Sequence, residues 1–453
     1  MKKLVLAGLS VLTLFFTGVP VHAGYNHAEL FKEQFKNAPE VTKKCLECHN
    51  DAASDVMKTT HWTWSFPQEV NGRKVDLGKE NAINNFCIAI TSNEPRCTSC
   101  HIGYGWKDAS FDFTDKTKVD CLVCHDTTGL YKKNPVGAGL PFPEVDLLKV
   151  AQNVGMPGRS NCGGCHFQGG GGDAVKHGDL DSSLTNPSAS LDVHMNKDGL
   201  NYTCQECHVT NHHQIGGNAL VVSPSGNNHF SCERCHANAP HRESLLNAHT
   251  ARVACQTCHI PDVAKELPTK VFWDWSKAGQ DREVILHDDY GKALFDKKKG
   301  EFKFAKNLVP TYAWYNSRAG VYLAGDKIDP DGVNLLSYPK GDITDKNAKI
   351  YPFKIHDGVQ PYDVENKTLI VPHLFGPDGF WKHFDWEKAA ELGMKAAGMP
   401  YSGKLGWTRT RMYWRINHMV APKAQALGCL DCHGDNGRMD WKSLGYPGNP
   451  LKI

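Results

Sequence analysis

Long apolar runs, stretches of a single charge and cysteines outside one motif are all scarce in this 453-residue chain. After residue 23, no segment is apolar over the roughly 20 residues that a membrane-spanning helix needs. Lysine and arginine (51) nearly balance aspartate and glutamate (49), and no basic run is present. These absences argue against nucleic acid as a partner and against a chain that spans a membrane.

The first 23 residues differ from the rest of the chain. They combine Lys2 and Lys3, an apolar stretch over 4–19, and Val21-His22-Ala23 before Gly24. This layout predicts a cleavable secretory signal. No twin arginine is present, and no cysteine follows residue 23 for lipid attachment. We therefore expect a protein that is exported to a bacterial periplasm, with residues 24–453 forming the mature chain.

Cysteine is concentrated in one motif. Of the 17 cysteines, 16 form eight copies of C-x-x-C-H, and Cys87 is left over. The eight copies are Cys45/Cys48/His49, Cys97/Cys100/His101, Cys121/Cys124/His125, Cys162/Cys165/His166, Cys204/Cys207/His208, Cys232/Cys235/His236, Cys255/Cys258/His259 and Cys429/Cys432/His433. A disulfide scaffold needs no histidine after the second cysteine, and a zinc site needs only paired C-x-x-C units. Haem c needs all three residues, because two thiols bind the vinyl groups and the imidazole binds the iron. The cofactor we expect is eight covalently bound haems c.

The motif spacing predicts how the chain is organised. Seven motifs crowd into residues 45–259, which leaves too little polypeptide for independent domains around each haem. Residues 260–428 contain no cysteine and read as a covering segment, and the eighth motif lies in 429–453. Within the covering segment we expect short strands, for example at 349–356, and helices at 385–397 and 408–426. The fold class we predict is mainly α with extensive loops around a compact haem core, as one domain over 24–453.

Eight irons have sixteen axial positions, and the motif histidines supply eight ligands. Fourteen other histidines follow the signal segment, so histidine alone could cap every iron. Those just before or between motifs are the better candidates: His61, His194, His213 or its neighbour His212, His229, His249 and His418. An iron with two firmly bound imidazoles can only pass electrons, whereas catalysis needs an open or displaceable position.

Cys87 and Lys176 are two further candidate functional residues. Cys87 lies among Phe86, Ile88 and Ile90, so its thiol is either buried as a small apolar group, kept for its reactivity or used in an intermolecular disulfide. Lys176 follows four glycines at 169–172; by composition alone it is a solvated lysine, but as a neutral amine it could bind iron.

The motif arrangement, Cys87, the Lys176 loop and the segment 411–423 before the last motif resemble the octahaem tetrathionate reductases. The resemblance covers essentially the whole mature chain. It implies seven haems with two histidine ligands and one catalytic haem, bound by Cys97, Cys100 and His101, with Lys176 as its displaceable distal ligand. It also implies that Cys87 lies beside that haem, with Asn84 and Asp173 as polar neighbours.

The resemblance gives a mechanistic hypothesis. The thiolate of Cys87 attacks tetrathionate, the haems deliver electrons, and Lys176 supplies positive charge once it has left the iron. The partners expected are a small sulfur or nitrogen oxyanion and a periplasmic or membrane-bound electron donor. Two alternatives remain open. One is a nitrite or hydroxylamine reductase that uses the same haem, and the absence of a C-x-x-C-K motif disfavours nitrite. The other is a multihaem electron carrier without catalysis.

Overall fold

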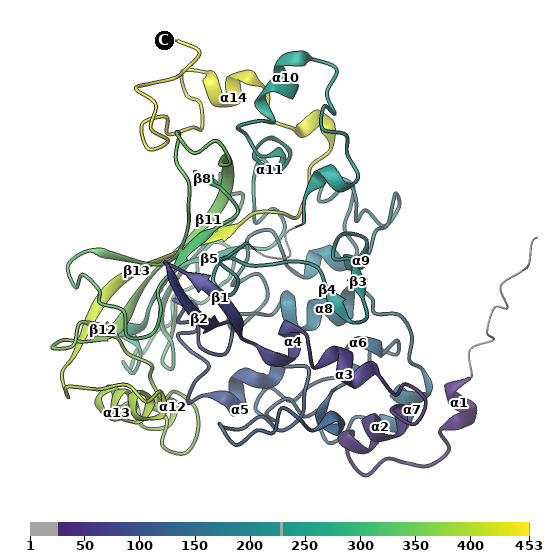
Figure 1. Ribbon diagram of the computed structural model, residues 1–453. Helices are drawn as coiled ribbons and strands as arrows, with labels where there is room; N and C mark the ends of the chain where they lie inside the picture. Colours follow the sequence, from purple (N-terminus) through teal and green to yellow (C-terminus); the bar gives the residue numbers. More distant parts are fainter. Residues whose placement is uncertain (1–25, 227–229, 453) are drawn as a thin grey trace, which may run out of the picture.

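The computed structural model describes residues 26–226 and 230–452 (Figure 1). The expected signal segment and His229, one of the predicted ligands, lie outside these ranges. Over the described ranges, no helix has both the length and the hydropathy needed to cross a membrane.

The helices are short, and seven attachment motifs lie in or directly beside an α-helix; the sixth lies on a 3-10 turn, Cys232–Arg234. The α-helices are α1 (His27–Leu30), α2 (Ala38–Cys45), α3 (Ala52–Val56), α4 (Thr60–Thr63), α5 (Glu94–Cys97), α6 (Leu122–His125), α7 (Leu147–Gln152), α8 (Arg159–His166), α9 (Cys204–Cys207), α10 (Ser244–His249), α11 (Cys255–His259), α12 (Phe380–His383), α13 (Trp386–Ala396) and α14 (Cys429–His433). A single turn brings the two cysteines of a motif to the same side of the helix, which is the arrangement that a doubly attached haem requires.

The strands lie mostly in the stretch without cysteine. They are β1 (Phe66–Val70), β2 (Arg73–Leu77), β3 (Thr210–Asn211), β4 (Gln214–Ile215), β5 (Thr269–Asp274), β6 (Phe295–Asp296), β7 (Gly300–Ala305), β8 (Thr311–Tyr315), β9 (Ala319–Val321), β10 (Val333–Pro339), β11 (Lys349–Asp363), β12 (Thr368–Leu369) and β13 (Leu405–Arg415). Nine of them form one mixed sheet in the order β6-β7-β5-β11-β13-β10-β9, with β8 and β12 also paired to β11. In this sheet β5 runs parallel to β11, and β13 antiparallel to it.

The prediction of a mainly α fold is wrong, because this nine-stranded sheet is the largest regular element. The error is clearest at 408–426, where a helix was expected and strand β13 is found instead. Thr408, Thr410, Met412 and Trp414 are buried and alternate with less buried residues, which is the period of a strand with one face on the core. The helix expected at 385–397 is confirmed as α13, whose first turn Asp385 caps.

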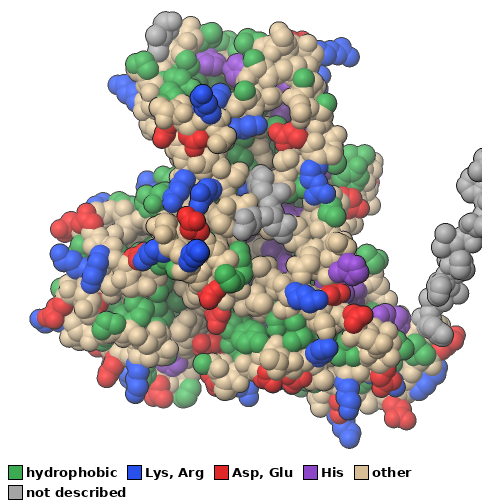
Figure 2. Space-filling model, viewed as in Figure 1, with side chains coloured by type: hydrophobic (Ala, Val, Ile, Leu, Met, Phe, Trp, Pro, Cys, Tyr) green, Lys and Arg blue, Asp and Glu red, His purple; other side chains and the backbone are tan. Residues whose placement is uncertain are grey.

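The sheet and the motif helices occupy different parts of the molecule (Figure 1). The motif helices run along one side, from α2 and α6 through α8 and α9 to α11 and α14, and the sheet lies beside them. The largest hydrophobic cluster lies on the sheet, where Trp273 and Trp275 stack against each other and Met412 and Trp414 are buried. Figure 2 shows histidine side chains at the surface on the side of the motif helices, with both signs of charge intermixed over the face.

Candidate haem-binding and catalytic site

Seven motif histidines each face a second histidine from elsewhere in the described chain. The pairs are His49 with His27, His125 with His213, His166 with His61, His208 with His418, His236 with His194, His259 with His241 and His433 with His249. Their ring centroids are 6.0–6.4 Å apart. A metal ion about 2 Å from one nitrogen of each ring would leave two ring centres about 6 Å apart. The spacing therefore fits one iron between each pair of imidazoles.

Hydrogen bonds orient several of these rings for that role. The Nδ1 atoms of His125 and His208 lie 2.8 and 2.7 Å from the carbonyl oxygens of Gly155 and Gly216. A ring that donates from Nδ1 keeps its lone pair on Nε2, which is then free to bind a metal ion.

The structure brings together most of the histidines proposed as distal ligands. His61, His194, His213, His249 and His418 each lie opposite a motif histidine. Sequence reasoning counted His27 and His241 as spare histidines but did not select them. Both lie near a motif in the chain, His27 before the first and His241 between the sixth and the seventh, and this position was the signal that could have identified them.

His101, the remaining motif histidine, lies in a different environment. It is 1% exposed and packs against Trp62, Trp64 and Trp106. Its Nε2 lies 2.7 Å from the carbonyl oxygen of Trp62, and its buried Nδ1 has no hydrogen-bond partner in the described chain. Burial lowers the pKa of this imidazole to about 3, so the ring is neutral and donates from Nε2.

Lys176 and Cys87 both lie beside the motif of His101. The Cys87 thiol is within hydrogen-bonding contact of Cys97, and the Lys176 ammonium interacts electrostatically with Cys100. The Nζ of Lys176 lies 5.4 Å from the ring centre of Trp414 and 5.9 Å from that of Phe86. Burial lowers the pKa of Lys176 to about 8, and the charge of Lys79 acts in the same direction. The structure therefore places a thiol in contact with this motif and an amine close enough to interact electrostatically with it.

The thiol of Cys87 ionises readily in this setting. A hydrogen bond from Cys97 lowers its pKa to about 7; burial opposes this change, and the positive charges of Arg96, Lys79 and Lys299 assist it. Once haem is attached, Cys97 becomes a thioether that cannot donate, and only the cationic neighbours continue to favour the thiolate.

Asn84 and Asp173 lie near Cys87 and Lys176 in sequence, but their side chains bond to their own loops. The Oδ1 of Asn84 accepts from the backbone N–H groups of Cys87 and Ile88, at 2.7 and 3.2 Å. This holds the β-branched Ile88 at a φ of 79°, which such residues rarely adopt. Asp173 accepts from the backbone N–H and the hydroxyl of Ser182. Both residues shape the loops that carry the thiol and the amine.

The sheet holds the Cys87 loop in place. The side-chain amide of Asn85 donates to the carbonyl oxygen of His356 in β11 at 2.7 Å. Gln360, four residues further along β11, donates to the carbonyl oxygen of Asn84 at 2.8 Å. A strand in the cysteine-free stretch thus anchors a loop that lies more than 260 residues earlier in the chain.

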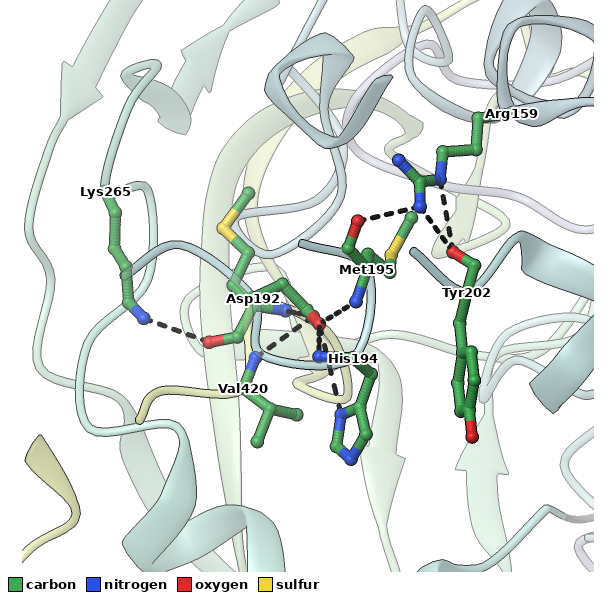
Figure 3. Close-up of polar contacts among 8 residues, drawn as sticks. Arg159, Asp192, His194, Met195, Tyr202, Lys265 and Val420 are labelled. Carbon is green, nitrogen blue, oxygen red and sulfur yellow. Dashed lines mark hydrogen bonds and ion pairs between the residues drawn. The ribbon is translucent and has the colours of Figure 1, made fainter. Parts of the chain in front are cut away.

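A buried carboxylate joins two of the loops that carry paired histidines (Figure 3). Asp192 is 3% exposed and accepts from four backbone N–H groups, those of His194 and Met195 on one side and of Met419 and Val420 on the other. Arg159 binds the carbonyl oxygens of Met195 and Tyr202, which flank the same turn. These contacts fix the backbone beside both His194 and His418.

The motif cysteines also lie close to one another across the chain. Side chains are in hydrogen-bonding contact for Cys45 with Cys121, Cys100 with Cys165, Cys162 with Cys204 and Cys232 with Cys255. Electrostatic interactions link Cys124 with Cys162, Cys207 with Cys235 and Cys258 with Cys432. These contacts give a continuous order of motifs, one-three-four-five-six-seven-eight, with motif two joined to motif four. The site of Cys87 and Lys176 is thus a side branch of that series.

The motif cysteines differ in their exposure. Cys48, Cys235 and Cys429 are exposed, whereas the other motif cysteines are partly buried. In the first motif, Cys45 ends α2 in contact with Cys121, and Cys48 lies in the turn that follows the helix. A thioether bond needs only a sulfur that reaches the edge of the ring, so Cys48 remains the predicted second attachment residue of the first haem.

Comparisons with known proteins agree with this geometry. Family models for bacterial cytochrome c and for cytochrome c554 and c-prime match residues 270–436 and 44–126. A crystal structure of octaheme cytochrome c from Shewanella oneidensis is 56% identical, covers 95% of this chain and 98% of its own, and superposes with a TM-score of 0.91. An uncharacterized protein of Archaeoglobus fulgidus is 26% identical over 247 residues, which is 43% of this chain and 82% of that protein.

Proposed function

The chain belongs to the octahaem cytochromes c, and from that premise we propose that it is an oxidoreductase that reduces tetrathionate to thiosulfate beside Cys87. The eight motifs bind eight haems c covalently, as the relatives and the family models indicate. The observation that carries the proposal is that one motif, that of His101, has a thiol in contact with it and an amine near it, and that no second histidine of the described ranges faces its ring as in the other seven.

Seven haems serve as electron carriers in this proposal. The two histidines of each pair would hold the iron of one haem, which would leave it no position for substrate. The contacts between motif cysteines support a route along the series, with a branch from motif four to motif two through Cys165 and Cys100. Electrons thereby reach the haem beside Cys87 one at a time.

Lys176 supplies the distinctive ligand of the haem at Cys97 and Cys100. The sequence resemblance assigns His101 and Lys176 as the two residues that would hold this iron. We propose that the amine of Lys176 is the displaceable one, so that a small molecule could take its place. When bound, this haem supplies electrons and an iron with an accessible position.

Cys87 acts as the nucleophile. Its thiolate attacks one of the two central sulfurs of tetrathionate, the central S–S bond breaks, and thiosulfate leaves with that electron pair. The cysteine now carries an S-thiosulfonate group, and two electrons cleave this new S–S bond to release the second thiosulfate and restore the thiolate. Lys79, Arg96 and Lys299 favour both the thiolate and the arrival of a dianion. Neither step needs a net proton.

Residues 1–23 support a periplasmic location, where the electron donor would be a periplasmic or membrane-bound protein. Holoprotein reduced under anaerobic conditions should be mixed separately with tetrathionate, nitrite and hydroxylamine while haem absorbance is followed. The proposal predicts rapid reoxidation by tetrathionate with two thiosulfates formed per two electrons. Reoxidation by nitrite or hydroxylamine alone would favour the nitrogen-oxyanion alternative, and no reoxidation by any of them would indicate an electron carrier.

A further inference from the structure

The backbone of the loop that carries Lys176 is bound by a second lysine, which is buried. Lys354, in the middle of β11, is 2% exposed. Its Nζ donates to the carbonyl oxygens of Val175 and Lys176, both at 3.1 Å, and to the Oγ1 of Thr269 at 2.5 Å. An ammonium group has three N–H donors, and each of them has an acceptor here.

Thr269, at the start of β5, continues the same network. Its hydroxyl lies 2.7 Å from the carbonyl oxygen of Ala174 and 3.0 Å from that of His177. Because its single hydrogen serves these carbonyls, the oxygen accepts from Lys354. Four successive carbonyl groups, those of residues 174–177, thus face two side chains of the sheet. The contacts to Ala174 and Val175 are buried and those to Lys176 and His177 are partly buried, so a lost donor would leave at least one buried carbonyl unsatisfied.

A third strand completes the support. Trp414 lies directly opposite Lys354 in the β11–β13 pairing. Its ring meets that of His177 at 5.0 Å and faces the Nζ of Lys176. Residues from β5, β11 and β13 therefore contact the backbone, the neighbouring ring and the amine of one loop.

The loop needs this support because its own sequence does little to fix its shape. Gly170 and Gly171 adopt positive φ angles of 80° and 97°, and Ala174 adopts 61°. Glycine visits many other conformations at little cost, and an alanine in the left-handed region is strained. Without external contacts the loop would sample many shapes, and few of them would direct the Lys176 amine toward the haem.

We infer that Lys354, together with Thr269, is a positioning residue that sets the backbone of Lys176 so that its amine binds the iron at Cys97 and Cys100. This inference rests on one part of the proposed function, namely that Lys176 is a ligand of the haem iron. Lys354 touches neither substrate nor iron, and it acts through the loop carbonyls.

The test measures whether the side-chain nitrogen of Lys176 is bound to the haem iron. Holoprotein is produced with ¹⁵N-lysine, and the hyperfine coupling of the lysine nitrogen to the haem iron is measured as cyanide is added to displace it. With Lys354→Met, the cyanide concentration at which half the signal is lost should fall at least about tenfold, because the loop must be ordered at the expense of the iron–amine bond. Thr269→Val should give a smaller fall, and Thr269→Ser should restore wild-type behaviour.

Two controls separate the possible outcomes. Lys270→Met removes a different buried lysine, which lies in β5. The Nζ of Lys270 lies over the rings of Trp273 and Phe302, so this substitution should leave the lysine signal unchanged. Lys176→Met should abolish it; a signal that was absent already from the wild type would refute the ligand role of Lys176 and with it this inference. If wild type gives the signal but Lys354→Met and Thr269→Val titrate like wild type, with haem content retained, Lys354 is not a positioning residue. Amide hydrogen exchange over 169–178 reports loop loosening without reference to haem, and faster exchange with unchanged ligation would also overturn the inference.

Discussion

The side chains of Cys87 and Cys97 are in contact, so the unpaired thiol lies beside an atom to which haem is attached. The tight turn of Asn84 and the contacts of Asn85 with β11 fix this arrangement. A free thiol could be an inert core residue, but here it lies between an attachment site and several cations.

Replacing Cys87 with alanine should lower the rate of tetrathionate reduction at least about 10³-fold, because the nucleophile is lost. Haem content and the absorption spectrum should not change. Thiosulfate formation should be measured by single turnover with reduced protein, and nitrite reduction by the same sample serves as an internal control. Unaltered thiosulfate formation in the variant would exclude a thiolate pathway.

The pH dependence should follow the thiolate of Cys87. A hydrogen bond from Cys97 contributes most to its pKa of about 7, and this donor disappears when Cys97 becomes a thioether. The pKa in the holoprotein should therefore lie above 7, and the rate should rise with pH through this value and then level off. Single-turnover rates between about pH 5 and 10 check the sign; a rate that falls as the pH rises would contradict it.

His241, one of the two histidines that sequence reasoning did not select, allows a direct test of iron ligation. Changing His241 to methionine should replace one imidazole ligand with a thioether and raise the reduction potential of a single haem. Potentiometric titration with optical detection can follow the change. His383→Met is the matched control, because the Nε2 of His383 lies 2.8 Å from the carbonyl oxygen of Pro377 and has no role in the proposed ligation. Equal potentials in the two variants would argue against His241 as a ligand.

Ring orientation divides the seven histidine pairs into two groups. Interplanar angles are 11°, 16° and 25° for the pairs at His259, His49 and His208. They are 70–79° for the other four. Electron paramagnetic resonance of the oxidised protein should therefore contain rhombic low-spin signals from near-parallel rings and strongly anisotropic ones from near-perpendicular rings. A single class of low-spin signal would disagree with this geometry.

Asp192→Ala should destabilise the fold by about 2 kcal/mol, since one buried and three partly buried N–H groups lose a charged acceptor. The thermal midpoint at a fixed scan rate measures this loss. Because Asp192 contacts the backbone beside both His194 and His418, the potentials of two haems should change together. Asp192→Asn keeps one acceptor oxygen and should give a smaller loss of stability; a change confined to one haem would show that the two loops are not coupled.

The sequence predicted those features that are encoded locally. Each C-x-x-C-H unit fits on a helical turn, and α13 follows from its apolar period and its aspartate cap. The cysteine-free stretch was harder, because β13 contains aromatic and arginine residues that suit a helix or a strand equally well, and only pairing with β11 decides between them. Sequence reasoning also missed Lys354. Nothing nearby marks a buried lysine as special, and its partners lie 85 and about 180 residues away.

Along β11, Lys354 supports the loop of the amine and His356 holds the loop of the thiol, and only one residue separates them. Inserting or deleting a single residue between them would turn either the Lys354 side chain or the His356 carbonyl oxygen away from its partner. The phase of β11 therefore ties the two loops to each other. Under the proposed function, a stretch that binds no haem covalently would affect the chemistry available to one haem, and we expect relatives with a different substrate to differ here before they differ in any attachment motif.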